Sequence, residues 1–195
     1  MNADGKNREW ISEGERPRWS QDGEKLVFAA AFEGFSSLYL YDPVSLERTR
    51  ILGPGYSQII GASFSPDGKR LVYVGYRKGT IADNNPYGEL AIVDARSESI
   101  PNIILQGRVG YHPDWSPEGS KLLFRTADES AVERLQVVDL EGARESVLLP
   151  NQFGKVNGNA IWSPDGKRIA FLTARNGGSD VYVMNADGSD QRKVG

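Results

Sequence analysis

A short motif occurs four times in this chain: an aromatic residue, a serine, a turn segment that ends in glycine, and then an apolar stretch. The copies are Trp19-Ser20-Gln21-Asp22-Gly23, Phe64-Ser65-Pro66-Asp67-Gly68, Trp115-Ser116-Pro117-Glu118-Gly119 and Trp162-Ser163-Pro164-Asp165-Gly166. Their aromatic residues are 45, 51 and 47 positions apart. A period near 45 residues over the whole chain indicates an array of one repeated supersecondary unit.

The Ser-Pro-Asp-Gly segment has the chemistry of a tight turn between two antiparallel strands. In the second copy, Ser65 suits the first position of a type I turn, Pro66 sets φ at the next, and Gly68 suits the left-handed position that follows. Such a loop joins the two strands of a hairpin with a bulge. We therefore expect a strand on each side of every copy of the motif.

Each repeat contains four expected strands, A to D in chain order. Strand A ends at the aromatic residue, and strand B is the apolar stretch after the turn, as at 71–74 and 169–172. Strand C ends in Asp or Asn, as at 90–94 and 181–185, and a more polar strand D follows at 48–52, 102–105, 145–149 and 191–194. Because continuously apolar strands are typical of burial on both faces, neighbouring repeats are expected to stack.

Radial stacking of four-stranded sheets gives a β-propeller. The sequence therefore predicts an all-β chain with a single β-propeller domain over residues 1–195. Its four blades of antiparallel strands are expected at roughly 12–52, 53–106, 107–149 and 150–195. The strand-A aromatic recurs at one fixed position in the repeat, which favours a place in the core between blades.

The two ends of the chain have the same phase. Asn2-Ala3-Asp4-Gly5 repeats Asn185-Ala186-Asp187-Gly188, so residues 1–11 are expected to form an extra outer strand. The chain would then hold twelve strands of types A to C and five of type D. A four-bladed ring with one redundant strand fits this count, and so does an excerpt of a larger propeller, which we favour. In an excerpt, exposed blade faces would invite self-association.

The repeat resembles the WD40-like (PD40) propeller repeat of the TolB family, which runs W-S-P-D-G-K-R-I-A-F and, after a gap, I-Y-V-M-N-A-D-G-S. Residues 162–171 and 181–189 reproduce this pattern almost letter for letter, and residues 64–73 match its first part. The resemblance implies a periplasmic or other extracytoplasmic location. It also implies a protein or peptide partner, such as a peptidoglycan-associated lipoprotein or another envelope protein. The same repeat resembles the gating propellers of prolyl-oligopeptidase-type peptidases.

Composition excludes several other classes of function. The chain has no cysteine, which excludes disulfides, thiolate catalysis and cysteine-ligated metals. Its 23 basic and 26 acidic residues are interspersed and give a net charge of −3, without the basic stripe of a nucleic-acid-binding protein. We expect no membrane span, because no apolar run is long enough. Residues 1–11 are polar and lack the apolar segment of a signal peptide.

Strand direction places the D-to-A and B-to-C loops on one face, opposite the short turns. We call this the variable-loop face, and loops on a rigid scaffold often carry binding sites. The candidate binding residues on it are Tyr56, Tyr76, Arg77, Tyr111, His112, Phe153, Asn157, Asn159 and Arg175.

His112 is the only histidine in the chain. It could be a metal ligand or general base at the mouth of the channel, or a loop residue that packs beside Pro113. We favour the second interpretation, because a metal site usually needs several ligands, and no G-x-S-x-G motif of a hydrolase is present. The segment 83–85 lacks the spacing of a calcium loop. The sequence therefore predicts no catalytic residues, no metal and no cofactor.

The leading hypothesis is a non-enzymatic propeller that binds a protein or peptide through its variable-loop face. One alternative is an accessory gating propeller of a prolyl-oligopeptidase-type peptidase whose catalytic domain is absent from this chain. Another is a lyase or hydrolase with its site at the mouth of the channel. Fold alone does not choose among them.

Overall fold

The computed structural model describes residues 10–77, 88–107, 112–127, 133–142, 144–149, 160–174 and 178–194. All regular elements within these residues are strands, and their pairings are antiparallel. The strands are β1 (Glu15–Trp19), β2 (Leu26–Phe32), β3 (Phe35–Tyr41), β4 (Arg48–Arg50), β5 (Tyr56–Phe64), β6 (Arg70–Arg77), β7 (Gly88–Asp94), β8 (Asn102–Gly107), β9 (Asp114–Trp115), β10 (Lys121–Ala127), β11 (Glu133–Asp139), β12 (Arg144–Leu149), β13 (Ala160–Trp162), β14 (Arg168–Thr173), β15 (Asp180–Asn185) and β16 (Arg192–Lys193). The predicted all-β architecture is confirmed.

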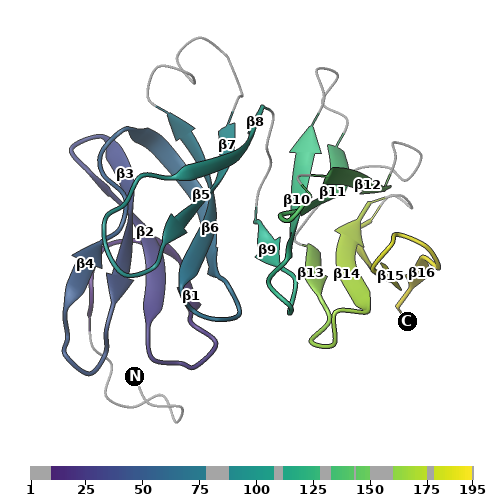
Figure 1. Ribbon diagram of the computed structural model, residues 1–195, viewed down its shortest axis with the longest axis horizontal. Helices are drawn as coiled ribbons and strands as arrows, with labels where there is room; N and C mark the ends of the chain where they lie inside the picture. Colours follow the sequence, from purple (N-terminus) through teal and green to yellow (C-terminus); the bar gives the residue numbers. More distant parts are fainter. Residues whose placement is uncertain are drawn as a thin grey trace.

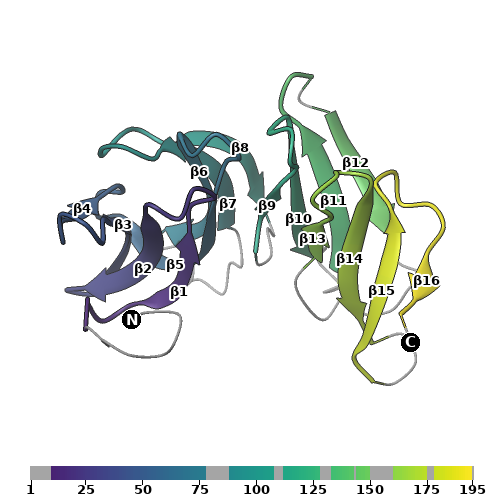
Figure 2. The ribbon, with the colours of Figure 1, turned by 90° about the horizontal axis from the view of Figure 1, so that it is seen from below.

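The strands follow one another in four units that repeat the expected A-to-D order: β1–β4, β5–β8, β9–β12 and β13–β16 (Figure 1). Figure 2 shows the units as an arc, with units 1 and 4 at its two ends. The strands β1, β5, β9 and β13 lie along the inside of the arc, and β4, β12 and β16 lie on the outside. The extra outer strand expected over residues 1–11 falls almost wholly outside the described residues.

The Ser-Pro-Asp-Gly turns form as the sequence predicts. The carbonyl of Ser65 accepts the N–H of Gly68 at 2.8 Å, and Gly68 has a left-handed φ of 68°. The Ser65 hydroxyl donates to Asp67 at 2.5 Å and accepts the N–H of Arg70 at 3.0 Å. The serine hydroxyl thus bonds to a backbone N–H on the other side of the turn, where the two strands of the hairpin begin. This role explains why the serine recurs at every A-to-B turn.

Units 1 and 2 are more closely joined than the repeat predicts. They form one eight-stranded sheet, because Tyr56 at the start of β5 pairs with Ser36 of β3. The short β4 pairs only with the second half of β3, at Tyr39–Tyr41. The first half of β3 is therefore open to the strand that leads into the next unit.

Three hydrophobic clusters lie between successive units, as expected for stacked sheets. In β6, Leu71 and Tyr73 pack towards unit 1, whereas Val72 and Val74 pack towards unit 3. Side chains of a strand alternate between its two faces, so residues 71–74 are all apolar because both faces of this part of the strand are buried.

The strand-A aromatic residues divide into two classes. Trp115 and Trp162 are 5% and 9% exposed, and each packs against the unit that precedes it. Phe64 packs against the hydrophobic cluster between units 1 and 2. Trp19 is 58% exposed, so the expectation of a core position is wrong for this copy. Trp19 belongs to the unit at the end of the arc, and no described unit precedes it.

Candidate functional site

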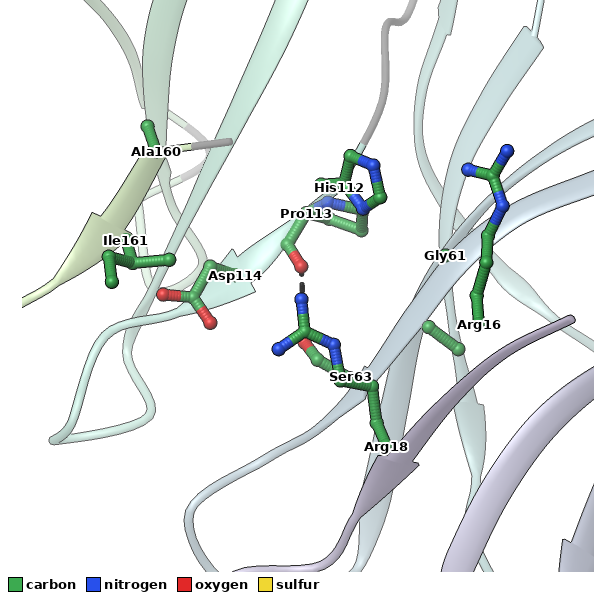
Figure 3. Close-up of a pocket in the computed structure, with 10 residues that line it drawn as sticks. Arg16, Arg18, Gly61, Ser63, His112, Pro113, Asp114, Ala160 and Ile161 are labelled. Carbon is green, nitrogen blue, oxygen red and sulfur yellow. Dashed lines mark hydrogen bonds between the residues drawn. The ribbon is translucent and has the colours of Figure 1, made fainter. Parts of the chain in front are cut away.

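A pocket of about 180 Å³ lies on the inside of the arc, where the inner strands of all four units converge (Figure 3). We call it the axial pocket. Its lining comprises Arg16 and Arg18 of β1, Gly61, Ala62 and Ser63 of β5, His112 and Pro113 before β9, Asp114 of β9, and Ala160 and Ile161 of β13.

The lining residues occupy equivalent places in the repeat. Arg18, Ser63, Asp114 and Ile161 each stand directly before the strand-A aromatic, and Arg16, Gly61 and His112 stand three positions before it. Neighbouring residues of a strand point to opposite sides. While the aromatic residues of units 2 to 4 pack between units, the residues beside them reach the pocket.

The backbone has a left-handed conformation at the three described positions that precede the aromatic by three. The φ angles are 57° at Arg16, 73° at Gly61 and 58° at His112. In β1 and β5 the pairing register shifts at these places, which marks a bulge that re-aims the local side chains. A Cβ on Gly61 would lie 3.3 Å from Nδ1 of His112, so the glycine leaves room for the imidazole.

Hydrogen bonds connect the inner strands around the pocket. The Ser63 hydroxyl donates to the carbonyl of Pro113 at 3.2 Å, and Nε1 of Trp115 donates to the carbonyl of Ser63 at 3.2 Å. The Asp114 carboxylate accepts the backbone N–H of Trp162 at 3.1 Å. These bonds join unit 2 to unit 3 and unit 3 to unit 4, and so hold the pocket wall in place.

The pKa values of two titratable groups in the pocket, His112 and Asp114, are shifted in opposite directions. Burial lowers the pKa of His112, and the guanidinium groups of Arg16, Arg18 and Arg125 lower it further, so the imidazole is neutral at pH 7. Burial raises the pKa of Asp114, and the Trp162 N–H and Arg18 partly oppose that rise.

A second polar cluster lies at the variable-loop end of unit 2. The Glu89 carboxylate is 3% exposed and accepts hydrogen bonds from Arg77 at 3.0 and 3.1 Å and from the Tyr56 hydroxyl. The Tyr56 and Tyr73 hydroxyls are 2.7 Å apart, and the Arg77 guanidinium lies over the Tyr56 ring at 5.0 Å. We call these four residues the Glu89 cluster. Burial, followed by the bond to Glu89, raises the pKa of Tyr56 to about 12.

The structure brings three of the four described candidate residues to two places. His112 lines the axial pocket, while Tyr56 and Arg77 belong to the Glu89 cluster, where the Tyr56 ring is buried and the Arg77 side chain is half exposed. Tyr76 is partly buried against the same cluster of apolar residues as Trp115. The other candidates, Tyr111, Phe153, Asn157, Asn159 and Arg175, lie outside the described residues.

The sequence reasoning missed Arg16, Arg18, Ser63 and Asp114, because it looked for binding residues only in loops. The available signals were the positions one and three residues before each strand-A aromatic. In the described part of the chain, no group of three or more His, Cys, Asp or Glu is placed to hold a metal ion. The described residues also include no helix that is long and apolar enough to cross a membrane.

No protein-family model matches the chain. Among curated proteins, dipeptidyl-peptidase 5 of Porphyromonas endodontalis is 34% identical over 95 residues, which cover 44% of this chain and 13% of that protein. The relationship therefore concerns a small part of the relative's length.

Several solved structures superimpose on nearly the whole chain. A putative TolB from Agrobacterium tumefaciens has a TM-score of 0.76 at 22% identity, covering 93% of this chain and 61% of that one. TolB from Acinetobacter baumannii has a TM-score of 0.75 at 20% identity, covering 95% and 45%. The β-propeller domain of the Trilobed protease from Pyrococcus furiosus has a TM-score of 0.62 at 17% identity, covering 93% and 56%. This chain thus spans about half of these structures and has a TolB-like β-propeller fold.

Proposed function

We propose that this chain is a non-enzymatic β-propeller scaffold that binds a protein or peptide through the axial pocket and the variable-loop face around it. The observation that carries the proposal is the convergence of Arg16 and Arg18 from β1 with His112 just before β9 and Asp114 of β9 on one pocket. Pockets with a few convergent polar groups are the usual form of a binding site. The Ser63 hydroxyl is bonded to a backbone carbonyl rather than to the imidazole of His112, which favours binding over nucleophilic catalysis.

The Glu89 cluster supplies a rigid anchor on the same face. The Arg77 guanidinium donates two hydrogen bonds to Glu89 and lies over the Tyr56 ring, and both contacts hold it in place while its side chain remains 48% exposed. An arginine that is already ordered loses little conformational entropy on binding, and arginine is enriched at interface hot spots.

We further propose that residues 1–195 form one propeller domain with the blade boundaries expected from the repeat. The resemblance to the TolB repeat supports an extracytoplasmic location and an envelope protein, such as a lipoprotein, as the partner. The exposed Trp19 at the end of the arc favours self-association of the isolated chain through this face.

A second candidate function is a gating propeller that admits peptides to a peptidase domain. The 34% identity to part of a dipeptidyl-peptidase favours it. A peptidase domain encoded in the same reading frame as this chain would support it. Both functions require contact with peptides, so one binding experiment tests what they share.

The experiment measures fluorescence anisotropy of labelled peptides of about six residues, with varied sequences and with either a free or an amidated C-terminus. Saturable binding that weakens in His112→Ala and Arg77→Ala, but not in the exposed-surface control Arg96→Ala, supports the proposal. A chain that binds no peptide of either kind, while its circular dichroism shows a folded β protein, would refute it.

A further inference from the structure

The axial pocket has a feature that peptide binding in general does not require. Arginine stands at a position where the backbone is left-handed, three residues before Trp19, and the equivalent place in unit 2 is Gly61. Only glycine adopts this conformation without steric cost, and strain of this kind is concentrated at functional sites. The Arg16 side chain therefore occupies a place where a glycine would be more stable.

The described lining of the axial pocket is electropositive. Arg16 and Arg18 carry permanent positive charge, and Asp114 is the one acidic side chain among the described lining residues. Asp114 is already engaged by the Trp162 N–H, and its burial disfavours the charged form. Glu15 lies 3.7 Å from Arg16, but it is 72% exposed, so solvent screens the pair.

The side chains of the pocket are also arranged around a common space. In Figure 3 the Arg18 guanidinium and the Asp114 carboxylate point into the centre from β1 and β9, and the Arg16 guanidinium extends beside the His112 ring. Arginine presents a planar fork of N–H donors that matches the two oxygens of a carboxylate. The His112 ring lies in the same lining.

Pocket size limits what can enter. A volume of about 180 Å³ is below that of pockets that enclose a whole small-molecule ligand. It suits one charged end of a longer chain, with the rest lying on the variable-loop face. Ala160 and Ile161 form an apolar wall opposite β1, and the described lining contains no Trp, Tyr or Phe ring on which a sugar could stack.

We propose that the axial pocket binds a carboxylate carried by a peptide, either the C-terminal carboxylate or an Asp or Glu side chain near the end, through Arg16 and Arg18. The inference rests on the proposed function and specifies its ligand. In this arrangement Arg18 takes the carboxylate at the centre of the pocket. Arg16 and His112 contact it from the variable-loop side.

The test uses three peptide pools of about six uncharged residues, each labelled at the N-terminus with a fluorophore that carries no carboxylate. One has a free C-terminus, one an amidated C-terminus, and one an amidated C-terminus with a single Asp in the last two positions. The two carboxylate-bearing sources are thereby separated. We expect at least one carboxylate pool to bind about tenfold or more tightly than the uncharged amide pool, and increasing salt to reduce the difference.

The variants Arg18→Gln and Arg16→Gln should each weaken carboxylate binding about tenfold and so remove most of the difference between the carboxylate pools and the uncharged pool. Arg96→Gln, on the exposed surface, serves as the matched control, and thermal denaturation verifies that each variant is folded. Equal affinity for all three pools would overturn the carboxylate inference while the proposed peptide-binding function stands. Failure of every pool would overturn both.

Discussion

Replacing Trp162 by alanine tests whether the strand-A aromatics hold neighbouring units together. Trp162 is 9% exposed and belongs to a buried cluster with Leu123 and Val137 of unit 3. Truncation of a buried tryptophan costs about 3–5 kcal/mol of unfolding free energy. The Trp162 Nε1 is buried without a hydrogen-bond partner among the described residues, so its removal recovers part of a desolvation cost. We therefore expect a loss near the lower end, about 3 kcal/mol.

Trp19 provides the matched control within the same chain. It occupies the same repeat position, but it is 58% exposed, so Trp19→Ala should change the unfolding free energy by less than about 1 kcal/mol. Urea denaturation followed by far-UV circular dichroism gives both values without relying on tryptophan fluorescence. Slopes that agree with the parent protein would show that the change lies in stability and not in the denatured state.

A second pair of variants separates packing from hydrogen bonding. Trp115→Phe removes the bond from Nε1 to the carbonyl of Ser63, whereas Trp162→Phe removes an N–H without a described partner. The first substitution should therefore cost about 1 kcal/mol more than the second.

The alanine variants decide whether the strand-A aromatics hold the units together. Equal losses in Trp19→Ala and Trp162→Ala, or a loss below about 1 kcal/mol in Trp162→Ala, would refute the inter-unit role.

Three further substitutions test the turn, the buried cluster and the bulge. The Ser65 hydroxyl and the Lys69 N–H lower the pKa of Asp67 below its ordinary value of 3.8. The Asp67 carboxylate therefore stabilises the fold above pH 3.8, and this stabilisation is lost as pH falls through the lowered pKa. Below about pH 4, the urea midpoint should fall less in Asp67→Asn than in the parent protein. The pKa of Tyr56 is raised from its ordinary value of 10.0 to about 12, so the stabilisation from its protonated hydroxyl is complete below pH 10 and is lost between pH 10 and about pH 12. The urea midpoint of Tyr56→Phe should therefore change less over that pH range than the midpoint of the parent protein. Gly61→Ala should destabilise the fold by about 1 kcal/mol or more and so lower the thermal midpoint, because φ is 73° at this position and the new Cβ would lie 3.3 Å from His112. An unchanged thermal midpoint would contradict the account of the bulge.

Features of the fold that depend on neighbouring residues could be predicted from the sequence. The turn between β5 and β6 is determined by the backbone preferences and local hydrogen bonds of Ser65, Pro66 and Gly68. This turn then sets the register in which β5 pairs with β6. The apolar character of β6 predicted burial on both faces in the same way. Each of these inferences needed only the local chain and the stacking of like units.

Features that depend on which units meet could not be predicted in this way. Trp19 has the same local sequence context as Trp162, and only its place at the end of the arc makes it exposed. Glu89 stands in the apolar strand β7 and would be costly to bury alone, yet Arg77 of the neighbouring strand β6 and Tyr56 of β5 satisfy it. These partners are 12 and 33 residues away, beyond the reach of a local pattern.

The strand-A aromatic also explains why the repeat can carry a site that differs from unit to unit. In units 2 to 4 the aromatic side chain fixes the strand against its neighbours, so the residue directly before it is held at the pocket whatever its chemistry. That residue is arginine, serine, aspartate and isoleucine in the four units. Their small, charged and apolar side chains share one backbone geometry, and an asymmetric pocket results from a symmetric scaffold. Changes at Arg18 should therefore alter binding far more than stability, whereas changes at the aromatic residues of units 2 to 4 should do the reverse.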